Sequence, residues 1–139
     1  MIETIAGIIV AVLIILVSQA LSKHFTPKFV AVTILVAIAF IYVGFSLKGN
    51  PVELIILESQ VALLFYFLAI AGYKRNNQLI ALGIIFHGVW DILHHNGLLI
   101  NTDMPGYWPS FCLTVDIIDG IYFLVIFRKQ KKQQLILKH

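Results

Sequence analysis

The chain has 139 residues, of which 60% are hydrophobic and only 12% are charged. Soluble domains usually carry about 25% charged residues, so this composition excludes an ordinary water-soluble globular protein and favours a protein that lies in a lipid bilayer. The formal net charge of +3 does not indicate a nucleic-acid partner, because the basic residues lie in short clusters between apolar runs, as membrane topology requires.

Five apolar runs are long enough to cross a bilayer, since a hydrocarbon core of roughly 30 Å needs about 20 residues of α-helix. Segments that contain polar residues, glycine or proline separate the runs. We therefore expect an all-α polytopic membrane protein, with one transmembrane domain over residues 1–139 and its helices in one bundle. The predicted helices cover residues 5–21, 29–47, 52–72, 78–96 and 107–127.

The first two predicted helices carry no charged residue. The first one lacks a basic leader and a small-residue cleavage site, so we expect it to remain in the membrane rather than to be removed as a secretion signal. Both helices contribute hydropathy and no candidate ligand.

The third predicted helix carries a carboxyl group, Glu58, within its apolar run. In a helix, Glu58 shares one face with Ala62, Phe65, Ala69 and Gly72. Small residues on a face allow a neighbouring helix to approach closely. Glu58 is therefore expected to point into the bundle.

The fourth predicted helix contains the stretch HGVWDILHH, residues 87–95. At about 100° per residue, His87, Asp91 and His94 fall within an arc of roughly 60° on one face, and His95 lies at its edge. Ionisable groups within a membrane are costly and usually face a bundle interior or an aqueous cavity. The alternative for His94 and His95 is a position at the lipid headgroups, where the helix ends.

The fifth predicted helix carries Asp116 and Asp119 one turn apart, with Cys112 on the same face. Asp116 is expected to join the polar face of the fourth helix. Asp119 either supports that site or forms a hydrogen bond with a tyrosine such as Tyr42 or Tyr66. Cys112 is either a supporting residue or a small apolar core residue.

The depth of these groups in the bilayer predicts that they meet. At 1.5 Å per residue, Glu58 and Asp91 lie roughly 9 Å and 8 Å below the outer ends of their helices, and Asp116 lies roughly 13 Å below the outer end of its own. The helices alternate in direction, yet the polar groups come to similar levels. We therefore expect one site in the outer half of the bilayer, open to the outside.

The Lys and Arg residues between the apolar runs predict the orientation. With five spans, nine of the ten basic residues share one side of the membrane, and only Lys48 lies on the other. Because basic residues gather on the cytoplasmic side, we expect the N-terminus outside and the C-terminus inside. The nine residues are Lys23, Lys28, Lys74, Arg75, Arg128, Lys129, Lys131, Lys132 and Lys138.

The charges inside the predicted spans favour a metal ion, because several carboxyl groups lie there and no Lys or Arg does. Imidazole and carboxylate groups are ligands for zinc and iron, and helix bundles place them at i, i+3 and i, i+4 spacing. The predicted metal ligands are His87, Asp91, His94 and Asp116. The candidate catalytic groups are Glu58 and Asp116. The possible supporting residues are His95, Asp119 and Cys112.

Two segments carry a resemblance to a known family: FHGVWDILHH and, after a loop, PSFCLTVDIIDGIY. They resemble a family of small uncharacterised bacterial membrane proteins, in which one helix carries H-x3-D-x2-H-H and the next carries C-x3-D. The resemblance implies an architecture and no reaction. The matching positions are His87, Asp91, His94, His95, Cys112 and Asp116.

A weaker similarity links the His and Asp residues to membrane zinc hydrolases of the alkaline ceramidase and adiponectin-receptor type. Those enzymes have seven helices and an H-x3-H pair, which this chain lacks. The likeness is therefore an analogy between parts.

Two classes of function follow from these residues. The first is a membrane-embedded metal-dependent enzyme, a hydrolase or an oxidoreductase, that binds zinc or iron and acts on a lipid or other apolar substrate from the outer leaflet. The alternative is a proton- or cation-coupled transporter that uses the buried Glu, Asp and His residues. Membrane lipids are the expected partners, together with a second copy of the chain if it dimerises. The expected location is the bacterial inner membrane.

Overall fold

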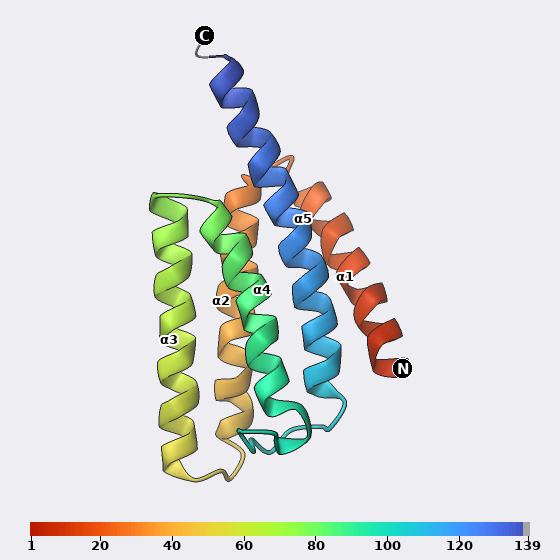
Figure 1. Cartoon of the computed structure of the whole chain (residues 1–139), viewed down its shortest axis with the longest axis vertical. Coiled ribbons are helices and arrows are strands. Elements are labelled where there is room, and N and C mark those ends of the chain that lie inside the picture. Colours follow the sequence, from red (N-terminus) through yellow and green to blue (C-terminus); the bar gives the residue numbers. More distant parts are fainter. Residues whose placement is uncertain (138–139) are drawn as a thin grey trace.

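The computed structural model describes residues 1–137, and these are all-α, without a β-strand (Figure 1). The helices are α1 (Ile2–Leu21), α2 (Pro27–Ser46), α3 (Val52–Lys74), α4 (Gln78–His94), the short 3-10 turn η1 (His95–Gly97) and α5 (Trp108–Ile136). Every segment that was predicted as a helix is helical, which confirms the all-α class. Lys138, one of the predicted inner-side residues, lies outside the described residues.

Four helices, α1, α2, α3 and α5, are long and apolar enough to cross a membrane, with mean hydropathies of 1.9 to 2.6. The chain is therefore built as an integral membrane protein. Helix α4 has 17 residues, fewer than the roughly 20 that a span needs. The predicted helix 78–96 ends early because His95 is extended and Asn96 has a left-handed φ of 52°. The structure thus has four candidate spans where the sequence predicted five.

Helix α4 is the central element of the bundle. It packs against α5, α3 and α2, and its buried face continues the apolar core into the polar site. Helix α1 lies at the edge and packs mainly on α5 (Figure 1). The apolar core includes Ile80, Ala81 and Ile84 of α4 and, on the neighbouring helices, Leu35, Ala69, Phe123 and Phe127.

Glycines allow α4 and α5 to approach closely. A Cβ atom on Gly120 would lie 2.4 Å from Cγ1 of Ile85 and 3.1 Å from the carbonyl oxygen of Ala81. On the facing helix, a Cβ on Gly88 would lie 3.5 Å from Cβ of Asp116. The absence of side chains at these two glycines brings the polar groups of the two helices within reach of each other.

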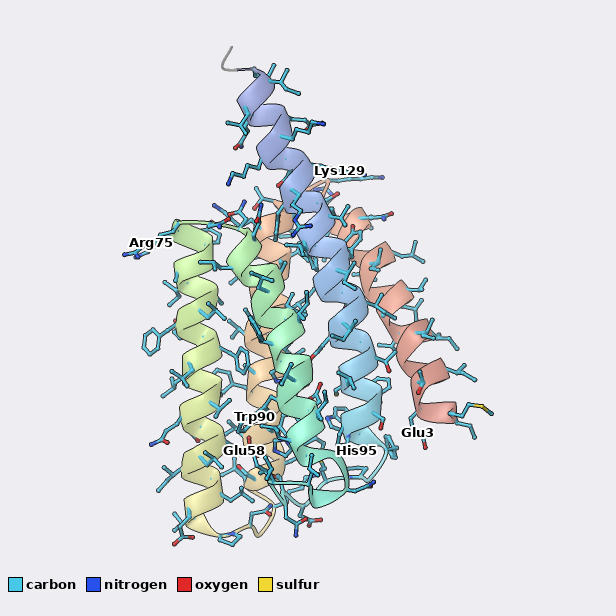
Figure 2. All side chains as sticks on the ribbon, in the orientation of Figure 1. Glu3, Glu58, Arg75, Trp90, His95 and Lys129 are labelled. Carbon is cyan, nitrogen blue, oxygen red and sulfur yellow. The ribbon has the colours of Figure 1, made fainter. Side chains whose placement is uncertain are left out.

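The two ends of the bundle differ in charge. At the end where α3 stops and α4 starts, here called the basic end, lie Arg75 and Lys129 (Figure 2). The opposite end, here called the loop end, holds the turn between α2 and α3 and the segment 98–107 that joins η1 to α5 (Figure 1). Helix α5 continues beyond the predicted limit at Phe127 because Arg, Lys, Gln and Leu are good helix formers.

Candidate metal centre

His87 and Asp91 of α4 meet Asp116 of α5 in the bundle interior. Each offers one ligand atom, and these atoms lie within 4.8 Å of one another. The His87 Nδ1 atom is 2.7 Å from Oδ2 of Asp116 and 3.9 Å from Oδ1 of Asp91. The exposed fractions of the three residues are 2%, 0% and 1%. The i, i+4 spacing on α4 places two of them on one face, and the close approach of α5 supplies the third.

Tyr42 of α2 forms a further side of this cluster. Its hydroxyl donates a 2.7 Å hydrogen bond to Oδ1 of Asp91, and the residue is only 1% exposed. The sequence suggested Tyr42 as a possible partner of Asp119, whereas the structure pairs it with Asp91. The depth of Tyr42 in the bundle could have indicated this contact, because Tyr42 lies near the loop end of α2, as Asp91 does on α4.

Glu58 of α3 and His94 of α4 form a second buried pair. Oε1 of Glu58 is 2.8 Å from Nε2 of His94 and accepts a 2.6 Å hydrogen bond from the Thr102 hydroxyl. Oε2 accepts a longer hydrogen bond, 3.3 Å, from the indole of Trp90. Both Glu58 oxygens therefore have partners. Figure 2 places Glu58 and Trp90 in the half of the bundle toward the loop end.

His94 uses both of its ring nitrogens in this pair. Nδ1 lies 2.9 Å from the Trp90 carbonyl oxygen, to which it donates, while Nε2 faces Glu58. The ring also stacks on Tyr42 with 4.2 Å between centroids. The group that could hold a metal thus contains three of the four predicted ligands, and His94 is the one that it leaves out.

The three predicted supporting residues lie in different surroundings. His95 is exposed, and its Nδ1 is 3.3 Å from the hydroxyl of Ser110. Cys112 is a buried free thiol. Asp119 is 1% exposed, and neither of its carboxyl oxygens has a hydrogen-bond partner among the described residues. Thr102 was not predicted at all, because a threonine in a loop gives no signal of the carboxylate that it will meet.

A cavity of about 210 Å³ lies beside the cluster, between the end of α4 and the start of α5. Its lining residues are Asp91, Ile92, His95, Pro109, Ser110 and Leu113. The cavity is therefore lined both by buried Asp91 and by the exposed His95, which lies toward the loop end (Figure 2).

The model of a family of unknown function, DUF6010, matches residues 2–129. The chain belongs to this family. The match confirms the resemblance drawn from the fourth and fifth predicted helices and extends it over all the helices as far as Lys129. No curated protein and no solved structure matches the sequence. Membership of this family therefore indicates no reaction, and a function has to be inferred from the chemistry of the site.

The donor set of this DUF6010 chain fits a divalent metal ion. Nε2 of His87 and Oδ2 of Asp91 are buried and have no hydrogen-bond partner within residues 1–137. A buried polar atom without a partner costs roughly 1–3 kcal/mol, and a bound cation would remove that cost. One imidazole and two carboxylates are ligands that zinc, iron and manganese accept.

Proposed function

We propose that this chain is a membrane-embedded metalloprotein that holds one divalent ion, zinc or iron, with His87, Asp91 and Asp116, and that it uses the ion in a reaction on a lipid or other apolar substrate. The observation that carries the proposal is the position of three fully buried ligand atoms within 4.8 Å of one another. Among the described residues, the buried carboxyl groups of Asp91 and Asp116 form no ion pair with a Lys or Arg. Such groups need protons or a cation, and a divalent ion balances both charges at once.

The residues around the ion would have separate tasks. A metal ion at this position supplies Lewis-acid polarisation of a substrate oxygen or activates water. Glu58 lies outside the group of three and is held by His94, Trp90 and Thr102. It is therefore a better candidate for accepting a proton than Asp116, which the ion would occupy. This division of roles suits a hydrolase and also an oxidoreductase.

The membrane arrangement belongs to the same proposal. Helix α4 serves as a fifth, short span, because it lies in the centre of the bundle between spanning helices. The basic end then faces the cytoplasm of a bacterial cell and the loop end faces outside. In this arrangement the substrate reaches the site from the outer leaflet.

Metal analysis of the purified protein tests the proposal. The unmodified protein, prepared in detergent without chelators, should contain about one zinc or iron ion per chain, and the His87→Ala and Asp91→Asn variants should contain little. His24→Ala is the matched control, because His24 is exposed in the turn between α1 and α2 and should leave the metal content unchanged. Unmodified protein that carries no metal, and takes up none on titration, would refute the proposal.

Asp119 favours a second candidate, a proton- or cation-coupled transporter. Its two oxygens are buried and have no hydrogen-bond partner in residues 1–137, and the residue lies one turn deeper in the bundle than Asp116. Such a carboxyl group can take up and release a proton or a monovalent cation. Proteoliposomes with a pH-sensitive dye inside test this candidate: an imposed cation gradient should move protons in the unmodified protein and not in Asp119→Asn.

A further inference from the structure

Polar residues contribute to the lining of the cavity beside the cluster. Asp91 is one of them, and its Oδ2 atom is buried and has no hydrogen-bond partner within the described residues. His95 and Ser110 also line the cavity, and the Ser110 hydroxyl lies 3.3 Å from Nδ1 of His95. Two hydrogen-bonding residues that the metal centre does not use therefore share this lining with one of its proposed ligands.

The remaining wall of the cavity is apolar. Ile92, Pro109 and Leu113 line it, and Ile92 is 42% exposed on the outer surface of the helical bundle. In a membrane protein, an exposed isoleucine on a helix faces lipid chains. The cavity is therefore bordered by polar groups toward the loop end and by a surface that an alkyl chain can contact.

The size of the cavity limits what it can hold. A space of about 210 Å³ is smaller than the roughly 300–1,000 Å³ of ordinary small-molecule pockets, so it suits a group of a few heavy atoms rather than a whole lipid. Pockets that bind small molecules usually combine apolar walls with a few placed polar groups, and this cavity has that composition.

We propose that this cavity binds the polar head of a single-chain amphiphile, a hydroxyl or carbonyl group on an alkyl or acyl chain. Ser110 and His95 contact the head by hydrogen bonds, and the chain passes Ile92 into the surrounding lipid. The inference deepens the proposed function and rests on it for the reaction, because the head then lies next to Asp91, one of the metal ligands. His95 thereby becomes a substrate-binding residue rather than a support of the metal.

A pair of photoreactive probes tests the binding. The first is a long-chain alcohol with a diazirine close to its hydroxyl group, and the second is the matching hydrocarbon without the hydroxyl. After illumination in lipid nanodiscs, peptide mass spectrometry should find the alcohol on Pro109 and Leu113 and the hydrocarbon only on lipid-facing positions. Equal labelling of Pro109 and Leu113 by both probes would overturn the role of the polar groups.

Variants separate the cavity from the fold. Ser110→Trp, which fills the space, should abolish cavity labelling, whereas Ile121→Trp on the exposed face of α5 should preserve it. The double variant Ser110→Ala/His95→Gln should reduce labelling by the alcohol at least several-fold. Labelling that persists in Ser110→Trp would overturn the proposal.

The metal content of the same samples separates this inference from the proposed function. Bound metal without cavity labelling would refute the head-binding site alone. Cavity labelling in a protein that binds no metal would keep the amphiphile site and refute the metalloenzyme.

Discussion

Single hydrogen bonds explain why neighbouring polar residues in α4 have different partners. His87 and His94 lie on one face of the helix, yet His87 reaches Asp116 of α5 while His94 reaches Glu58 of α3. Tyr42 lies between the two pairs, because its hydroxyl bonds to Asp91 and its ring stacks on His94. The site therefore contains two linked carboxylate–histidine pairs. Among the described residues, the group around His87 has buried ligand atoms without hydrogen-bond partners, whereas the pair of His94 and Glu58 has none.

The three-residue group should respond to mutation as a unit. If His87, Asp91 and Asp116 share one cation, removal of any one of them weakens the binding of that cation. The remaining buried groups then lose the positive charge that balances them. Each single alanine variant should lose almost all bound metal, and double variants should be little worse than single ones. Metal titration in detergent measures this. Independent, additive losses would show that the three residues serve separate local roles.

The hydrogen bonds of His94 predict how its removal affects metal binding and stability. The sequence alone placed it among the ligands, but its two nitrogens are engaged by Glu58 and the Trp90 carbonyl. His94→Ala should therefore keep most of the metal while leaving the buried Glu58 carboxyl short of a partner. That loss should lower the free energy of unfolding by roughly 1–3 kcal/mol, measured as a lower midpoint of thermal unfolding. Complete loss of metal in His94→Ala would show that His94 is a metal ligand.

The order of elements explains which parts of the site the sequence could reveal. Spacing along α4 predicted that His87 and Asp91 share a face, and depth predicted that Asp116 joins them; the structure brings all three together. A helical wheel gives the face of a residue but not the helix that covers it, so the pairing of His94 with Glu58 was missed. Thr102 lies in a loop, where no periodicity places it.

The end of α4 shows the same limit for the fold. The predicted helix ran to Asn96, beyond the last apolar residue of the run, Leu93. His95 instead has an extended backbone, and Asn96 and Gly97 have φ angles of 52° and 66°, so α4 ends at His94. Left-handed conformations suit asparagine and glycine, but their presence permits such a turn without requiring it.

The close contact between α4 and α5 predicts the effect of a larger residue at Gly120. A methyl group on Gly120 would lie 2.4 Å from Cγ1 of Ile85, so Gly120→Ala should push the helices apart. Overpacking of this kind costs roughly 1–3 kcal/mol, and the shift should also lower metal affinity by separating Asp116 from His87.

Gly44→Ala is the control for this effect. Gly44 lies within α2, and a Cβ atom there would meet nothing within 4 Å. Because alanine favours a helix over glycine by up to about 1 kcal/mol, this variant should be neutral or slightly more stable and should keep its metal. Comparison of the unfolding midpoints and metal contents of the two variants measures the prediction. Equal behaviour of both would show that the close approach of α4 and α5 does not hold the site together.

At the scale of the whole molecule, the two ends of the bundle predict its orientation in the membrane. The segment 98–107 and the turn between α2 and α3 belong to one end, since the Asp103 amide donates a 3.1 Å hydrogen bond to Oδ1 of Asn50. Arg75 and Lys129 lie at the other end (Figure 2). Because basic residues remain on the cytoplasmic side, we expect the loop end outside.

Cysteine labelling decides both the orientation and the number of spans. In a Cys112→Ser background, cysteines at positions 50 and 103 should react with a membrane-impermeant maleimide added to intact cells, and a cysteine in place of Asn76 should react only after permeabilisation. Asn76 and Asp103 flank α4, so opposite accessibility of these two positions would show that its 17 residues cross the bilayer with the help of η1.

Labelling of position 76 from outside would reverse the orientation and place the metal centre in the inner half of the membrane. Labelling of 76 and 103 from the same side would mean that α4 does not cross, that the chain has four spans, and that its substrate cannot reach the site by the route proposed above.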